Sequence, residues 1–144
     1  YYPLLRPSQT SPVTRNLNRV RAEFASTVDT VGRDPRVKKS ILLTTSPDAR
    51  TVMPPMVISL EEADQLVPDA MFNQGPLPVA VLLQGTFSSV FAIRMAESIM
   101  DNPGLATLTE SKPTKKIVVA DGASIRNEIS WEGGRPEPLT PRRG

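Results

Sequence analysis

Three short apolar runs dominate the hydrophobic pattern of the chain, and polar residues flank each of them. The runs lie at residues 38–45, 77–83 and 116–120 and are rich in valine, isoleucine and leucine. Continuous apolar stretches of this length are typical of strands that are buried on both faces of a mainly parallel sheet. The pattern therefore predicts three core strands and an α/β fold.

The polar stretches between these strands contain helix signals. Ser11 and Pro12 have the residue types of an N-cap and a first helical position, but the residues that follow fit both helical and alternating spacing. For this segment we predict a short helix followed by a strand. Residues 59–62 match a capping box, and the residues over 88–100 and 124–129 predict two further helices.

The composition excludes several kinds of chemistry. The chain has no cysteine and no histidine, which removes thiolate nucleophiles, the common zinc-ligand sets and every catalytic arrangement that uses a histidine base. We therefore expect a non-enzymatic protein with no metal and no cofactor. A net charge of +2 that is spread along the chain, together with few aromatic residues, argues against a nucleic-acid partner.

The last part of the chain differs in character from the rest. Residues 1–131 hold the predicted α/β domain, whereas residues 132–144 are rich in proline and glycine and are expected to form an extended tail or linker. No apolar run approaches the roughly 20 residues that span a bilayer, so we expect the chain to be soluble. Because it does not begin with methionine and ends in a linker-like stretch, we interpret it as a piece of a longer protein.

Small polar residues follow each predicted strand. In an open α/β sheet the carboxyl ends of parallel strands meet at one edge, where loops and helix N-termini present free N–H groups to ligands. The sequence therefore predicts a rim that binds a ligand or a partner, although the same residue types also make ordinary turns. The predicted rim consists of Thr44, Thr45, Ser46, Gln84, Gly85, Thr86, Asp121 and Gly122.

The carboxylate in this rim opens an alternative. Asp121 could hold a divalent ion together with the threonine and serine hydroxyls, which would make the chain a small-ligand-binding or metal-assisted hydrolase domain. Hard cations normally collect more carboxylates than this rim offers. A non-catalytic binding role is therefore the first hypothesis.

Six stretches of the chain match a known family in one order between residues 1 and 129. They are Tyr2–Leu5, Pro12–Leu17, Phe24–Thr30, Ile41–Arg50, Pro78–Phe87 and Ser111–Gly122. With these stretches the chain resembles the gliding-motility-associated ABC-transporter accessory proteins of the GldG type. That type lies within the wider family of auxiliary components of uncharacterised ABC transport systems.

The resemblance implies both a fold and a setting. The fold is a three-layer α/β/α sandwich like that of the class I glutamine amidotransferases, of which this chain is an incomplete fragment. The setting is a parent protein anchored in the inner membrane of a Bacteroidetes-type bacterium, whose soluble region faces the periplasm beside an ABC permease and an ATPase. The expected role is protein or cargo binding in gliding motility or secretion-linked transport. An incomplete sheet also predicts an exposed edge through which the chain forms a homo-oligomer.

Overall fold

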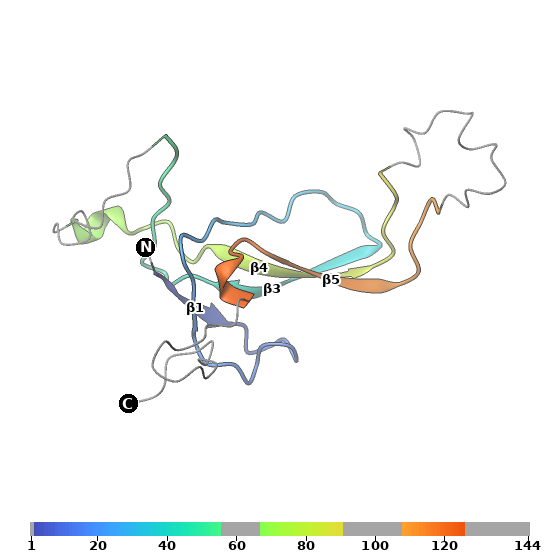
Figure 1. Cartoon of the computed structure of the whole chain (residues 1–144), viewed down its shortest axis with the longest axis horizontal. Coiled ribbons are helices and arrows are strands. Elements are labelled where there is room, and N and C mark those ends of the chain that lie inside the picture. Colours follow the sequence, from blue (N-terminus) through green and yellow to red (C-terminus); the bar gives the residue numbers. More distant parts are fainter. Residues whose placement is uncertain (1, 56–66, 91–107, 126–144) are drawn as a thin grey trace, which may run out of the picture.

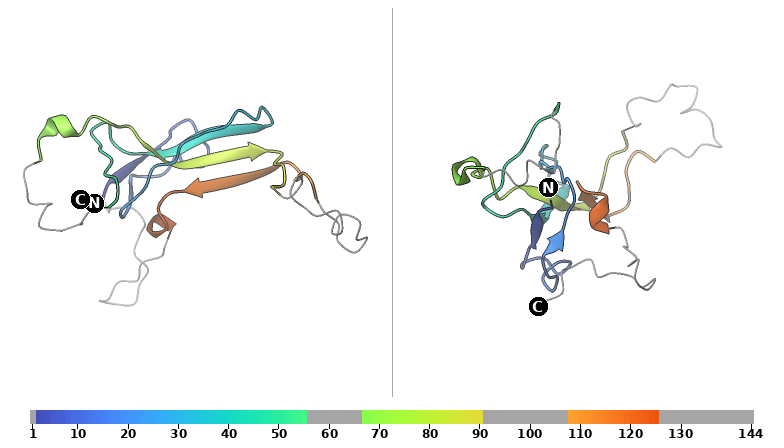
Figure 2. Two further views of the ribbon diagram at one scale, coloured as in Figure 1. Left: turned by 90° about the horizontal axis from the view of Figure 1, so that it is seen from above. Right: turned by 60° about the vertical axis from the view of Figure 1, so that its left-hand side comes forward.

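The computed structural model describes residues 2–55, 67–90 and 108–125, and these residues form one five-stranded sheet. The strand order is β2-β1-β3-β4-β5 (Figure 1). The sheet twists and curls along its length (Figure 2). The strands are β1 (Leu4–Pro7), β2 (Val20–Arg21), β3 (Val37–Thr44), β4 (Pro78–Gly85) and β5 (Thr114–Val119), and two short 3-10 helices are η2 (Asp69–Met71) and η3 (Ala123–Ile125).

The three predicted core strands are confirmed as strands, but the predicted fold class is wrong. Strands β3, β4 and β5 cover the three apolar runs, and each neighbouring pair in the sheet is antiparallel. The described residues contain no α-helix, so the mainly parallel, three-layer α/β sandwich expected from pattern and resemblance is not formed by this part of the chain. The error has a physical cause, because an apolar run reports burial and carries no information on strand direction.

The connection between β4 and β5 shows why these two strands are antiparallel. Parallel neighbours need a crossover, whereas antiparallel neighbours can belong to one hairpin. Here the pairing continues beyond the strand ends, through a bridge between Ser88 and Glu110 and a hydrogen bond from Ser89 N to Thr109 O of 2.8 Å. β4 and β5 are therefore the two arms of a long hairpin.

The helix predicted from Ser11 is replaced by turns. The Ser11 hydroxyl accepts a hydrogen bond from Val13 N at 3.3 Å, as an N-cap would, and the Ser11 carbonyl accepts bonds from the next turn. The chain then leaves this turn and enters β2, the strand expected after it. Strand β1 was not predicted, because prolines flank its short apolar segment.

The other helix predictions have different outcomes. A 3-10 turn, η3, lies where the helix over 124–129 was expected to begin. The capping box at 59–62 and the tail at 132–144 lie outside the described residues, as does all but the beginning of the predicted helix over 88–100. None of the helical segments among the residues described has the length and apolarity needed to cross a membrane.

The main core lies where β1 and β2 pack against the centre of the sheet. A bulge in β3 between Ile41 and Thr44 turns two consecutive leucines inward, so that both become buried. β4 contributes four consecutive buried residues. The core cluster consists of Leu5, Val20, Ala22, Leu42, Leu43, Val79, Ala80 and Leu82. For β5 the prediction of a buried core strand is wrong, because five of its six residues are exposed at the edge of the sheet.

Candidate functional site

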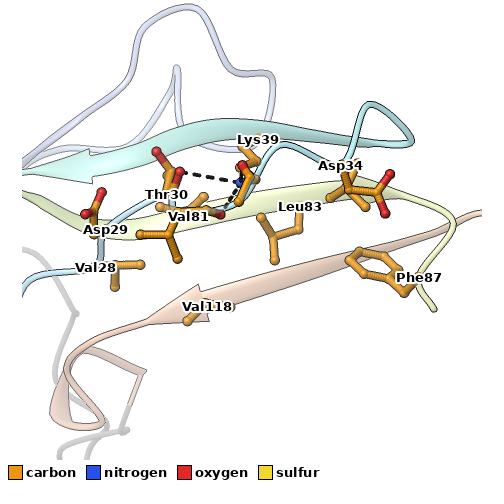
Figure 3. Close-up of a pocket in the computed structure, with 12 residues that line it drawn as sticks. Val28, Asp29, Thr30, Asp34, Lys39, Val81, Leu83, Phe87 and Val118 are labelled. Atoms are coloured by element: carbon orange, nitrogen blue, oxygen red, sulfur yellow. Dashed lines mark hydrogen bonds between the residues drawn. The ribbon is translucent and has the colours of Figure 1, made fainter. Parts of the chain in front are cut away.

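A groove lies between one face of the sheet and the segment Val28–Asp34, which connects β2 to β3 (Figure 3). It encloses about 410 Å³, a volume in the range of small-molecule and side-chain binding sites. Its floor comes from β3, β4 and β5, and Phe87 lies at one end. The apolar lining residues are Val28, Val31, Val37, Val81, Leu83, Phe87 and Val118.

The strand register places these side chains on one face of the sheet. Val81 pairs with Val118, and Leu83 pairs with both Lys39 and Lys116. Paired residues share a face, and residues two apart along a strand share it too. The valine and leucine residues at every second position of β4 therefore form a continuous apolar floor.

Lys39 holds the covering segment in place. Its ammonium group donates hydrogen bonds to the carbonyl oxygens of Thr30 at 3.4 Å, of Gly32 at 2.6 Å, and of Val31 (Figure 3). Gly32 has a positive φ of 82°, a conformation that glycine adopts without steric cost. This turn directs the carbonyl groups toward the lysine, so Lys39 is a latch between the sheet and the wall of the groove.

We expect Lys39→Met to loosen the groove wall while leaving the sheet intact. Methionine keeps most of the aliphatic stem but loses all three donated bonds, and a net loss of about 1 kcal/mol predicts roughly fivefold faster amide exchange in residues 28–34. Lys38→Met is the matched control, because Lys38 is the preceding residue of β3 and points to the opposite face. Equal exchange rates in the two variants would contradict the latch.

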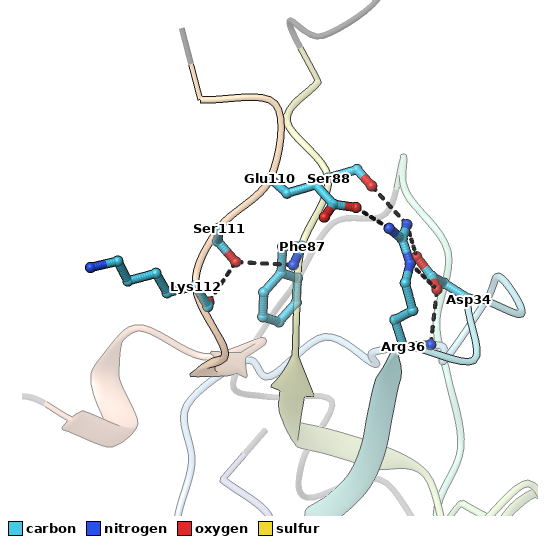
Figure 4. A network of polar contacts seen from close by, with 7 residues as sticks. All are labelled: Asp34, Arg36, Phe87, Ser88, Glu110, Ser111 and Lys112. Atoms are coloured by element: carbon cyan, nitrogen blue, oxygen red, sulfur yellow. Dashed lines mark hydrogen bonds and ion pairs between the residues drawn. The ribbon is translucent and has the colours of Figure 1, made fainter. Parts of the chain in front are cut away.

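A polar network closes the far end of the groove (Figure 4). The Arg36 guanidinium donates to Asp34 Oδ2 at 2.8 Å, to Ser88 Oγ at 2.8 Å, and to Glu110. Hydrogen bonds from Arg36 hold the pKa of Asp34 below its ordinary value, and Asp34 raises the pKa of Arg36 in turn. The network ties the start of β3 to the β4–β5 hairpin and pairs the charge of Asp34, which lines the groove.

Phe87 is fixed at the same end by two further contacts. Its backbone N donates to Ser111 Oγ at 3.0 Å, and the Lys116 ammonium lies 4.1 Å from the centre of its ring. A cation over an aromatic face is attracted by the ring quadrupole. The aromatic end wall is therefore positioned by both arms of the hairpin.

The lining of the groove is mainly apolar. Its ionisable lining residues are Asp29, Asp34 and Lys39, and the last two are occupied by the contacts above. Within the described ranges, no cluster of three histidine, cysteine or acidic residues could hold a metal ion. The arrangement is suited to hold an apolar group of a ligand or partner, with the charged groups around it directing its orientation.

The structure divides the predicted rim between opposite ends of the sheet. Thr44 pairs with Pro78 at one end of β3, and Val37 pairs with Gly85 at the other, about 23 Å away for a strand of this length. The expectation that all rim residues converge is therefore wrong, because it depended on parallel strands. Thr44, Thr45, Ser46, Asp121 and Gly122 lie toward one end, and Gln84, Gly85 and Thr86 lie at the other.

Two of the rim residues make structural bonds inside the protein. Thr45 is buried, and its hydroxyl accepts from Leu77 N at 2.9 Å and donates to Ser46 O at 3.0 Å. Asp121 is also buried, and it accepts bonds from Glu23 N at 3.0 Å, Ala123 N at 2.8 Å and Ser124 Oγ at 2.5 Å. Thr45 therefore joins the two ends of the β3–β4 connection, and Asp121 joins the end of β5 to the segment after β2.

The hydrogen bonds of Asp121 determine its ionisation. Burial raises the pKa of this carboxyl, but the bonds from Ser124, Glu23 and Ala123 outweigh burial and hold the pKa below its ordinary value. Both carboxylate oxygens are used by protein donors. Whether Asp121 or any other rim residue contacts a partner stays a prediction.

Sequence reasoning did not find the groove. The segment that forms its wall was not predicted to be part of a site, and Lys39 was predicted only as a member of the strand at residues 38–45. The signal that could have identified the site is the valine pair Val28 and Val31 beside a glycine turn, outside any regular strand. Apolar residues in an irregular connection need a surface to cover, and the face of β4 supplies it.

The groove is an apolar site with three ionisable lining residues, and comparison with known proteins adds the family. No curated protein and no solved structure matches the chain. A family model described as ABC-type uncharacterized transport system matches residues 1–143. The chain therefore belongs to this family of ABC transport system auxiliary components.

Proposed function

We propose that this chain is a non-catalytic binding module that holds an apolar segment of a partner protein or cargo in the groove between Val28–Asp34 and the sheet. The observation that carries the proposal is the apolar floor of the groove, beside which Asp34 is held by Arg36 and Lys39 by backbone carbonyl groups. An apolar group that enters such a groove gains the free energy of burial without displacing the contacts of Asp34 and Lys39.

The half of the predicted rim that lies beside the groove extends this site. Gln84, Gly85 and Thr86 lead directly into Phe87, the end wall. All three are partly exposed. A bound segment that leaves the groove past Phe87 would meet the polar groups of Gly85 and Thr86, whereas the side chain of Gln84 lies on the opposite face with Lys38.

The partners we propose are the permease and ATPase subunits of an ABC system. Family membership supports association with transporter components. The resemblance to the GldG type supports the finer proposal, namely the periplasmic face of an inner membrane, a membrane-anchored parent protein, and a role in gliding motility or secretion-linked transport. The groove then serves to recognise either a transporter subunit or the cargo delivered to it.

A single substitution at the mouth of the groove tests the proposal. Val31 lines the groove and is 76% exposed, so Val31→Asp places a charge in the site with little cost to folding. Losing the burial of a valine and adding a buried charge should reduce partner recovery about tenfold or more. The measurement is a pull-down of the tagged full-length parent protein from native membranes, with quantification of the permease and the ATPase.

The matched control is Val52→Asp. Val52 is also exposed, at 48%, and it lies in the β3–β4 connection and does not line the groove. Recovery that falls for Val31→Asp and persists for Val52→Asp supports binding in the groove. Recovery that is unchanged in both variants, or lost equally in both, contradicts it.

A further inference from the structure

Strand β5 forms one edge of the sheet. It pairs with β4 on one side, and no other described strand lies on its outer side (Figure 1). Five of its six residues are exposed. An edge of this kind presents a row of backbone donors and acceptors that can pair with another strand.

The direction of the backbone groups follows from the hairpin register. Ala120 N donates to Val79 O at 2.9 Å, so the N–H of Ala120 points to the β4 side, while its carbonyl accepts from Ser26 N at 3.1 Å. In an antiparallel pair, residues whose backbone groups point to the neighbouring strand alternate with residues whose backbone groups point away from it. Val118, Lys116 and Thr114 therefore also face β4, and the backbone groups of Lys115, Ile117 and Val119 point to the outer side.

The side chains of β5 divide into a basic half and an apolar half. The strand begins with Thr114, Lys115 and Lys116 and ends with three apolar residues. Ile117 is 53% exposed and Val118 is 42% exposed, on opposite faces of the strand. An occupant of this edge therefore meets an apolar contact on each face near the centre of the strand.

We infer that the occupant is a second copy of this chain, paired through an antiparallel β5–β5 contact centred on Ile117. In this register Ile117 lies opposite Ile117 of the other copy, and Lys115 lies opposite Val119. All three residues with outward backbone groups then form hydrogen-bonded pairs. Lys116 lies opposite Val118, so each lysine stem packs on a valine and no lysine faces a lysine.

The charges on β5 select this arrangement over the alternatives. A parallel contact in register would place Lys115 and Lys116 directly opposite the same lysines, which is destabilising. An antiparallel contact centred on Lys116 would place Lys116 opposite Lys116 of the other copy and leave Val119 without a partner residue in the other strand. Pro113 precedes the strand and has no N–H to extend the ladder, so the register centred on Ile117 also matches the length of the edge.

The contact joins two five-stranded sheets into one sheet of about ten strands, a size that open sheets reach. Residues that lie opposite each other in a sheet point to the same face. Val118 lines the groove, and it lies opposite Lys116 of the other copy. The two grooves therefore open on the same face of the dimer, on either side of the β5–β5 contact.

Disulfide trapping tests the register. The chain has no cysteine, so Ile117→Cys introduces a single thiol, and hydrogen-bonded antiparallel pairs have Cα atoms about 5.5 Å apart, within disulfide range. We expect the Ile117→Cys chain to form a covalent dimer under mild oxidation, with Val52→Cys as the control for random collision. If the Ile117→Cys chain forms a covalent dimer no faster than the Val52→Cys chain does, the register is overturned.

Sedimentation velocity of the full chain over a concentration series tests the dimer itself. We expect the unchanged chain to dimerise and Ile117→Asp to raise the dimer dissociation constant at least tenfold, because two carboxylates would meet at the centre of the contact. Ile117 is exposed, so circular dichroism should show an unchanged sheet.

Three results would overturn the inference. The first is a chain that stays monomeric at every concentration, and the second is a dimer that Ile117→Asp leaves intact. The third is a monomeric chain for which Ile117→Asp abolishes recovery of a membrane partner, because the edge would then belong to a strand of that partner. These results are independent of the groove test. Ile117 and the groove residue Val118 point to opposite faces of β5, and Val31→Asp, which tests the groove, does not alter β5.

Discussion

Replacing Asp121 with alanine is expected to lower the free energy of unfolding by about 3 kcal/mol. The carboxylate accepts hydrogen bonds from Glu23 N, Ala123 N and Ser124 Oγ. Alanine would leave these donors buried without a partner, and each buried donor that loses its acceptor costs about 1–3 kcal/mol before relaxation. The bond to Glu23 links residues 98 positions apart, so its loss also weakens the contact between the end of β5 and the segment after β2, where a bond from Ser26 N to Ala120 O remains.

The measurement is chemical denaturation of the full chain at neutral pH, followed through the sheet signal. Asp48→Ala is the control, because Asp48 is an exposed aspartate in a turn. We expect the control to change stability by less than about 0.5 kcal/mol. Equal unfolding free energies for the two variants would show that the Asp121 network does not stabilise the fold.

The same carboxylate gives the protein an acid-sensitive component of stability. Its pKa is lowered in the folded state, so the folded chain favours the ionised form more than the unfolded chain does. The stabilisation is complete above the unfolded pKa of about 3.9 and is lost as the pH falls through the lower, folded value. We expect acid unfolding to be steeper for the unchanged chain than for Asp121→Asn over that interval, and parallel curves would contradict this assignment.

Gly85→Ala is expected to destabilise the sheet by about 3 kcal/mol. Gly85 ends β4 with a φ of 147°, a conformation that other residues rarely adopt. A Cβ atom there would overlap the carbonyl oxygen of Arg36 and lie 2.9 Å from its carbonyl carbon. Both atoms belong to the backbone, so relief requires that β3 and β4 move apart.

Gly122→Ala is the matched control for this substitution. No atom lies within 4 Å of the position that its Cβ would take, so we expect a change of less than about 1 kcal/mol. Thermal unfolding of both variants measures the difference. A Gly85→Ala chain that melts with the Gly122→Ala chain would mean that β3 and β4 do not approach as closely as the structure has them.

These two glycines illustrate what sequence reasoning could and could not find at the predicted rim. Both were interpreted as parts of one binding edge, on the basis of residue type and position after a strand. Only Gly85 is required to be a glycine, because a Cβ atom there would overlap the backbone of Arg36. Gly85 and Gly122 lie at opposite ends of the sheet. Residue type identified the places where the chain turns, but the direction of each strand decided which turns are neighbours.

The sequence by itself determined where the three long strands lie, because runs of β-branched and leucine residues favour extended backbone, but it did not predict that β5 is largely exposed. It also determined that the chain offers no thiolate, no imidazole and none of the zinc-ligand sets that use them, since cysteine and histidine are absent. The serine at position 11 was correctly predicted to accept a backbone hydrogen bond, because that preference is local.

Only the tertiary structure decided how these parts combine. Strand direction depends on how the chain returns between strands, and a hydrophobic pattern does not encode that path. The latch at Lys39 and the bonds of Asp121 to Glu23 depend on segments that come together only after the sheet has formed. For the same reason the groove and the outer edge of β5 could be located only in the folded chain.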